Sequence, residues 1–383
     1  MSPKPKHIDY KKELNSAQLE AVMFDDGPLL VIAGAGSGKT RTLTYRVARL
    51  VEAGVPPAAI LLLTFTRKAS AEMLTRACRL LDDRCGKVSG GTFHSFANAI
   101  LRRYAAECGF GSGFSIMDRA DAESLIGMVK KELGFSAKKR AFPRNQTLAN
   151  IFSRGVNKGL SVDEVVFNDY PHFASAADDL TTLFNLYSER KLQLNFLDYD
   201  DLLVYLYRLL RDRSDIRQNL SATYRYIMVD EYQDTNHLQA EILYHLADRN
   251  HNVMAVGDDS QSIYAFRGAN FKNIIDFPRI FPGATIIGLE ENYRSVQPIL
   301  SLTNAVIDRA AEKYEKKLFT RRKGGTRPCL VDTVSENNQS RYVVDKVQEI
   351  ANTGVPLNQI AVLFRASFHS FDLEIELARE PVS

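Results

Sequence analysis

The chain has few cysteines, no long apolar run and almost no net charge, and each shortage excludes a class of protein. Its 383 residues include only four cysteines, and no two of them form a C-x-x-C pair: Cys78, Cys85, Cys108 and Cys329. This spacing argues against a zinc ribbon, a redox dithiol and a disulfide framework, so we expect buried thiols in a reducing, cytoplasmic environment. No uninterrupted apolar stretch approaches the ~20 residues that span a membrane, so we expect no membrane association. The 49 basic and 46 acidic residues give a net charge of +3, so any nucleic-acid contact must depend on where basic residues are placed.

An apolar run near the N-terminus ends in a loop of small residues. Residues 29–33 have the sequence LLVIA, which suits a buried parallel strand, and the loop that follows reads GAGSGKT. Its three glycines allow successive backbone N–H groups to face an anion. The spacing is that of a phosphate-binding loop, in which Lys39 reaches the β- and γ-phosphates and Thr40 binds magnesium. Ala33 occupies the first position of this motif, which is usually glycine, and a turn that binds nothing is the alternative.

Strand and helix signals alternate on both sides of a long helical stretch. Such alternation predicts an α/β fold with a parallel sheet covered by helices. Runs that suit strands occur at 29–33, 60–65, 226–229, 253–256 and 286–289. Strand signals are nearly absent between 101 and 195, which indicates a helical insertion. Its basic residues either face water or contact a nucleic-acid backbone. A second α/β pattern begins beyond residue 292, with strands expected at 329–331 and 360–364.

An acidic pair directly follows the apolar run 226–229. Hydrolysis of ATP needs magnesium held from a neighbouring strand end and a group that orients the attacking water. Asp230 suits the first role and Glu231 the second. The alternative is that the pair only forms a turn or caps a helix.

The stretch that follows the run 253–256 mixes polar and aromatic side chains. Gln261 is placed to sense a γ-phosphate. Tyr264 and Phe266 offer stacking faces and Arg267 a phosphate contact, a combination typical of single-strand binding. The alternative is that both aromatic side chains belong to an ordinary core.

Together these motifs resemble the UvrD/Rep/PcrA family of superfamily 1 DNA helicases. Eight stretches follow the order of that family: Leu14-Asn15 with Gln18, then residues 33–40, 63–69, 91–95, 197–203, 229–236, 256–269 and 289–295. The resemblance implies two RecA-like domains, 1A and 2A, with ATP and Mg²⁺ between them. Domain 1A would comprise residues 1–100 and 196–285, the helical insertion 1B residues 101–195, and the first part of 2A residues 286–383.

The resemblance also implies roles for individual residues. Gln18 would read adenine, Tyr293 would stack on the base, and Arg294 would reach the γ-phosphate as an arginine finger. Further nucleotide contacts would come from Ala33, Gly34, Ala35, Gly36, Ser37, Gly38 and Arg41. The single-stranded DNA track would comprise Thr64, Phe65, Thr66, His94, Tyr264, Phe266 and Arg267, although the family usually has tryptophan where this chain has Phe266.

We therefore expect an ATP-dependent DNA helicase or translocase of 3′ to 5′ polarity that acts on single strands and on single-strand/duplex junctions in repair or replication. The later motifs of the family and its 2B insertion have no counterpart before Ser383. We thus expect a monomer that binds ATP and single strands, hydrolyses ATP poorly and does not unwind duplex. Two alternatives stay open: the motor part of a helicase-nuclease, and a non-catalytic single-strand-binding protein that uses ATP as a switch.

Overall fold

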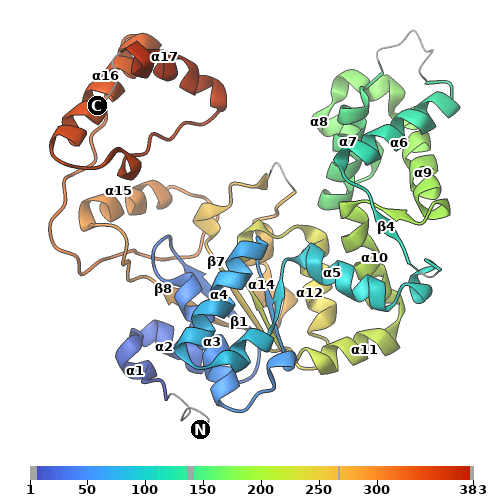
Figure 1. Ribbon diagram of the computed structural model, residues 1–383, viewed down its shortest axis with the longest axis horizontal. Coiled ribbons are helices and arrows are strands. Elements are labelled where there is room, and N and C mark those ends of the chain that lie inside the picture. The colour runs from blue at the N-terminus through green and yellow to red at the C-terminus, as the bar shows by residue number, and fades with distance from the viewer. Residues whose placement is uncertain (1–6, 112, 136–141, 266–267, 380–383) are drawn as a thin grey trace. The chain divides into compact units, whose positions relative to one another are not determined.

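A computed structural model describes residues 7–111, 113–135, 142–265 and 268–379 (Figure 1). The chain divides into two units, Met1–Gly325 and Thr326–Ser383. Within the described ranges, no helix combines the length and the apolar character needed to cross a membrane.

The first unit contains a six-stranded sheet in which every neighbouring pair of strands is parallel, as the sequence predicted. The order across the sheet is β3-β2-β6-β7-β1-β8. The strands are β1 (Leu29–Ala33), β2 (Ile60–Leu63), β3 (Ser89–Gly91), β6 (Tyr226–Val229), β7 (Val253–Gly257) and β8 (Thr285–Leu289). Because they are parallel, β1, β6 and β7 all end at the same edge, which brings together the three loops that the sequence singled out. Strand β8 overlaps the expected start of domain 2A at residue 286, and the division into domains remains a prediction.

Both faces of this sheet are buried, and successive strand residues enter opposite cores. Leu30 and Ile32 belong to one core, whereas Leu29 and Val31 belong to the other. Burial on both faces explains why these strands are continuous apolar runs instead of alternating ones. The first core includes side chains of α5 (Phe93–Arg103), α10 (Tyr199–Asp212), α11 (Ser214–Thr223), α12 (His237–Leu246), α13 (Lys272–Ile275) and α14 (Phe277–Ile280). The second includes side chains of α1 (Tyr10–Glu13), α2 (Ser16–Met23), α3 (Lys39–Glu52) and α4 (Arg67–Leu80).

The predicted insertion is helical and has a core of its own, which runs from Met117 to Tyr187. Its helices are α6 (Arg119–Glu132), α7 (Asn145–Lys158), α8 (Val162–Asp169) and α9 (Ala177–Gln193), drawn in green in Figure 1. Two short parallel strands, β4 (Ser115–Ile116) and β5 (Phe196–Leu197), pair where the chain enters and leaves these helices. Of the basic residues in this insertion, Arg154 forms an ion pair with Asp169. Lys138, Lys139 and Arg140 lie outside the described residues.

A buried lysine ties α9 to the start of α10. Lys191 Nζ lies 2.6 Å from Asp198 Oδ2 and 2.6 Å from Asp201 Oδ2, and 6% of the lysine side chain is exposed. Burial, followed by the charge of Asp198, raises the pKa of Asp201 above its ordinary value.

We expect Lys191→Met to lower the free energy of unfolding by roughly 3–5 kcal/mol, because it leaves two largely buried carboxylates without a counter-charge. Urea unfolding measures this loss. The matched control is Arg190→Met, which removes a solvent-exposed ion pair with Glu132 and should cost about 1 kcal/mol or less. Equal losses in the two variants would contradict the role of Lys191.

The second unit contains α16 (Glu336–Asn352) and α17 (Phe371–Arg379), whereas α15 (Gln297–Ile307) belongs to the first. The strands expected at 329–331 and 360–364 were wrong, because none of the described residues after Gly325 forms a strand. An extended apolar segment becomes a strand only when a neighbour pairs with its backbone. Here Leu330 and Leu363 are 96% and 92% exposed. Cys329 is also exposed, against expectation, whereas Cys85 is buried and Cys78 and Cys108 are partly buried.

Candidate nucleotide site

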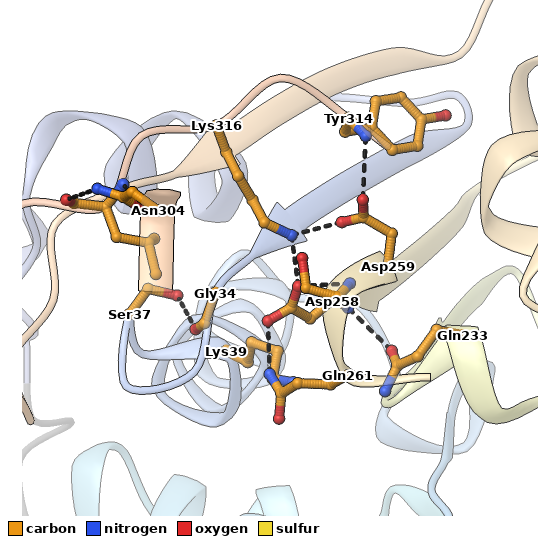
Figure 2. A network of polar contacts seen from close by, with 12 residues as sticks. Gly34, Ser37, Lys39, Gln233, Asp258, Asp259, Gln261, Asn304, Tyr314 and Lys316 are labelled. Carbon is orange, nitrogen blue, oxygen red and sulfur yellow. Dashed lines mark hydrogen bonds and ion pairs between the residues drawn. The ribbon is translucent and has the colours of Figure 1, made fainter. Parts of the chain in front are cut away.

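The phosphate-binding loop leaves β1 and turns tightly into α3. The backbone N–H and the hydroxyl of Ser37 both donate to the carbonyl oxygen of Gly34, at 3.1 and 2.7 Å (Figure 2). Gly36 and Gly38 have φ angles of +81° and +94°, values that a glycine adopts without the steric cost of a Cβ atom. Lys39 is the first residue of α3, so the loop lies at a helix N-terminus, where unpaired backbone N–H groups favour an anion.

Lys39 contacts the acidic pair that follows β6. Its Nζ atom lies 2.8 Å from Glu231 Oε2, with 10% of the lysine side chain and 33% of the glutamate side chain exposed. The backbone of Glu231 is left-handed, with a φ angle of +51°, which is uncommon for a residue with a side chain. Gln233 Nε2 donates to the same carboxylate oxygen at 2.8 Å. A bound phosphate would therefore have to replace Glu231 as the partner of Lys39.

Asp230 is a buried carboxylate with one oxygen, Oδ1, that has no hydrogen-bond partner among the described residues. Burial, followed by the charge of Glu231, raises the pKa of Asp230 to about 7. A bound Mg²⁺ would satisfy the unpartnered oxygen and favour the ionised form. The described residues contain no group of three or more His, Cys, Asp or Glu that could hold a metal ion, so phosphate and water oxygens would complete the coordination.

A cavity of about 620 Å³ connects these groups to the aromatic side chains near the same sheet edge. Five residues predicted to act on the nucleotide border it: Thr40, Asp230, Glu231, Gln261 and Arg294. Phe65, Thr66 and Tyr264, predicted to contact single-stranded DNA, border the same cavity. Asp234 is a further lining residue that the sequence reasoning missed. Its Oδ1 atom has no partner among the described residues, and burial, followed by the charge of Glu231, raises its pKa to about 6.

The loop after β8 is fastened to the phosphate-binding loop by a buried asparagine that the sequence reasoning also missed. Asn292 Nδ2 donates to the carbonyl oxygen of Ala35 at 2.5 Å, and its Oδ1 atom accepts from the backbone N–H of Arg294 at 2.9 Å. The N–H of Tyr293 donates to the carbonyl oxygen of Gly36 at 2.9 Å. A Cβ atom at Gly36 would lie 2.6 Å from Cβ of Arg294, so glycine permits this approach. A polar residue between a strand and a Tyr-Arg pair was the available signal, since asparagine often bonds loop backbone.

The residues expected near the adenine are brought together by Asn15. Gln18 is buried and its Nε2 atom donates to the carbonyl oxygen of Ser37 at 3.0 Å. Asn15 Oδ1 accepts from the Gln18 backbone N–H at 2.8 Å, and Asn15 Nδ2 donates to the Tyr293 hydroxyl at 2.9 Å. Tyr293 is 48% exposed and so is accessible for stacking.

Arg41 was also expected beside the nucleotide. In the structure its Nη2 atom donates to the backbone and side-chain oxygens of Glu13, at 2.7 and 2.9 Å. Its place beside a nucleotide remains a prediction.

Two of the expected DNA-track residues form an aromatic pair. Phe65 and Tyr264 stack with ring centroids 5.3 Å apart and planes at 26°, and Phe65 is 45% exposed. Thr66 caps α4 by accepting from the backbone N–H of Ala69, and the buried Thr64 donates its hydroxyl to the carbonyl oxygen of Thr66. Phe266 and Arg267 lie outside the described residues.

His94, also expected on the DNA track, contacts an aromatic ring instead of the cavity. It lies edge-on to the ring of Tyr199 at 6.2 Å, and burial lowers the pKa of its imidazole. A contact with DNA therefore stays a prediction for this residue.

Comparisons with known proteins show which family this chain is similar to. The family model of the UvrD/REP helicase N-terminal domain matches residues 14–282, and that of the UvrD-like helicase C-terminal domain matches residues 287–383. The chain is 39% identical over 378 residues to the ATP-dependent DNA helicase UvrD1 of Mycobacterium tuberculosis, covering 96% of this chain and 48% of that protein. It is 36% identical over 368 residues to the ATP-dependent DNA helicase PcrA of Bacillus subtilis, covering 96% of this chain and 49% of that protein.

The chain thus spans about half the length of the curated relatives it matches. The two family models together cover nearly all of it, and the first alone covers more than half. The chain belongs to the UvrD/REP family of helicases.

Proposed function

We propose that this chain binds Mg²⁺-ATP and single-stranded DNA in one cleft and forms the ATPase part of a DNA helicase or translocase. The cavity bordered both by the nucleotide residues and by the Phe65–Tyr264 pair carries this proposal. The names of the relatives, both ATP-dependent DNA helicases, support it. A 3′ to 5′ polarity, action at single-strand/duplex junctions and a role in repair or replication are further parts of the proposal.

The chain's own residues suggest how ATP would be handled. Lys39 would exchange its partner Glu231 for the β- and γ-phosphates, and the released carboxylate would orient the attacking water. Thr40 and Asp230 would hold Mg²⁺, which supplies positive charge to the phosphate oxygens when bound. Arg294, which borders the same cavity, would stabilise the charge that develops on the transferred phosphoryl group.

The Phe65–Tyr264 pair would contact the single-stranded DNA. Phe65 and Tyr264 come from loops after different strands, and bases can stack on such faces without sequence preference. Nucleotide-dependent movement of either loop would change the surface that a base meets.

We expect Phe65→Ala to weaken binding of a fluorescent oligo-dT by roughly 5–150-fold, because a base–aromatic stack contributes about 1–3 kcal/mol. Fluorescence anisotropy measures the dissociation constant. Phe167→Ala is the control, since Phe167 is 59% exposed on α8 and does not border the cavity. Unchanged affinity in Phe65→Ala would contradict the proposed strand site. ATP hydrolysis measured with and without the oligonucleotide completes the test, because stoichiometric ATP binding without strand-stimulated hydrolysis would favour an ATP-switched binding protein instead.

A further inference from the structure

A buried group of three charges lies beside the nucleotide cavity. Lys316 Nζ contacts the Oδ1 atoms of both Asp258 and Asp259, and only 3–4% of each side chain is exposed (Figure 2). Burial alone would raise the pKa of Asp258, but the ammonium group of Lys316 lowers it below its ordinary value. Asp258 is therefore held as a carboxylate although it is buried.

Asp258 forms hydrogen bonds with two residues that border the cavity, Gln261 and Gln233. Its Oδ2 atom accepts from Gln261 Nε2 at 2.6 Å, so Lys316 and Gln261 bind the two oxygens of one carboxylate. The backbone N–H of Asp258 donates to Gln233 Oε1 at 2.9 Å, and Gln233 in turn donates to Glu231. Lys316 is thus connected through Asp258 to Gln261, the proposed γ-phosphate sensor.

The segment that carries Lys316 is fixed on both sides of the lysine. Before it, the backbone N–H of Tyr314 donates to Asp259 Oδ2 at 3.0 Å. After it, Asn304 binds both the N–H and the carbonyl oxygen of Leu318, at 3.1 and 2.9 Å. Leu318 packs on the phosphate-binding loop, because a Cβ atom added at Gly34 would lie 2.6 Å from its Cδ2 atom. The lysine is consequently presented from a defined backbone and not from a loose loop.

We propose that Lys316 is a positioning residue that holds Gln261 in place through Asp258. The inference rests on the proposed role of Gln261 at the γ-phosphate. An ionised carboxylate with one oxygen fixed by the lysine offers the other oxygen to the Gln261 amide in a single orientation. Without the ammonium group, Asp258 is a buried carboxylate without a counter-charge, which must take up a proton or turn away. Gln261 then loses its acceptor.

The first test follows the Gln261 amide directly and requires no nucleotide. In a chain labelled with ¹⁵N-glutamine, the Gln261 side-chain NH₂ signal is identified by its loss in Gln261→Ala. We expect Lys316→Met, which keeps the apolar stem of the side chain, to shift this signal. Lys317→Met, at the exposed neighbouring lysine, should leave it in place. Asp258→Asn, which removes the charge at nearly constant volume, should shift it as well and replaces Lys316→Met if that variant does not fold. An unmoved signal in both would overturn the proposal.

The second test asks whether the link reaches the nucleotide. The readout is the ratio of the dissociation constants for ADP and for a non-hydrolysable ATP analogue. We expect Gln261→Ala and Lys316→Met each to lower this ratio roughly tenfold, since a hydrogen bond to a charged group is lost, while ADP affinity stays constant. Combined, the two substitutions should lower the ratio no further than one does. Effects that multiply would overturn the proposal, because a purely structural lysine acts independently of Gln261. If the unsubstituted chain does not discriminate between the nucleotides but Lys316→Met shifts the amide signal, the role of Gln261 at the γ-phosphate fails and the positioning stands.

Discussion

Substitution of Lys39 by alanine should weaken Mg²⁺-dependent ATP binding by at least about 30-fold, because truncating one member of a buried charge pair costs roughly 2–5 kcal/mol. The lysine lies 2.8 Å from Glu231 and is 10% exposed. Without it, the phosphates would face Asp230 and Glu231 with no cation from α3 between them. Repulsion between like charges would add to the loss of attraction.

Isothermal titration with ATP and Mg²⁺ measures this effect. Lys87→Ala is the matched control, since Lys87 is an exposed lysine outside the cavity, and it should bind ATP as the unsubstituted chain does. Near-equal affinities in Lys39→Ala and the unsubstituted chain would refute the assignment of the phosphate-binding loop.

Unlike Lys39→Ala, Glu231→Gln should slow ATP hydrolysis without weakening ATP binding. We expect the single-turnover rate of ATP hydrolysis to fall by roughly 10²–10⁴-fold, the usual contribution of a positioned general base. ATP affinity should be kept or should rise, because glutamine no longer competes with the phosphates for the Lys39 ammonium group. The charge of Glu231 also contributes to the raised pKa of Asp230, so its removal should favour the ionised Asp230 that Mg²⁺ needs.

Quench-flow with excess protein over labelled ATP measures the hydrolysis step apart from product release. Glu107→Gln, at an exposed glutamate away from the cavity, controls for the loss of one negative charge. A Glu231→Gln chain that hydrolyses ATP at the unsubstituted rate would remove Glu231 from the chemistry. One that fails to bind ATP would show that the carboxylate serves the structure of the loop.

The sheet and its functional edge could be predicted from the sequence because their signals are local. The run Leu29–Ala33 is apolar at every position, as a strand buried on both faces must be, and the loop after it has the spacing that a phosphate needs. Asp230 directly follows a second such run. Parallel pairing then places both loops at one edge, whatever the order of the strands.

The contacts that complete the site could not be predicted in this way. Lys39 and Glu231 are 192 residues apart in sequence, and Lys316 and Asp258 are 58 apart. The local pattern of apolar and polar residues cannot predict such ion pairs, because they depend on which segments the fold brings together. Asn292 gave only the general signal of a polar residue in a loop, and its contact with Ala35 shows what it binds.

The wrong strands in the second unit show the converse limit. Cys329–Val331 and Ile360–Phe364 have apolar character that favours strands, but a strand also needs a partner for its backbone. The described residues of this unit supply none. Local pattern therefore identified the preference of these segments but not their structure.

The central claim is that nucleotide and single-stranded DNA share one cavity, and it is tested most directly by measuring oligo-dT affinity with different nucleotides bound. The dissociation constant should differ at least about fivefold between saturating Mg²⁺-ADP and a saturating Mg²⁺-bound ATP analogue. The oligonucleotide should change the relative affinity for the two nucleotides by the same factor, because such coupling is reciprocal. Identical oligo-dT affinities with either nucleotide and with none would contradict a shared cavity.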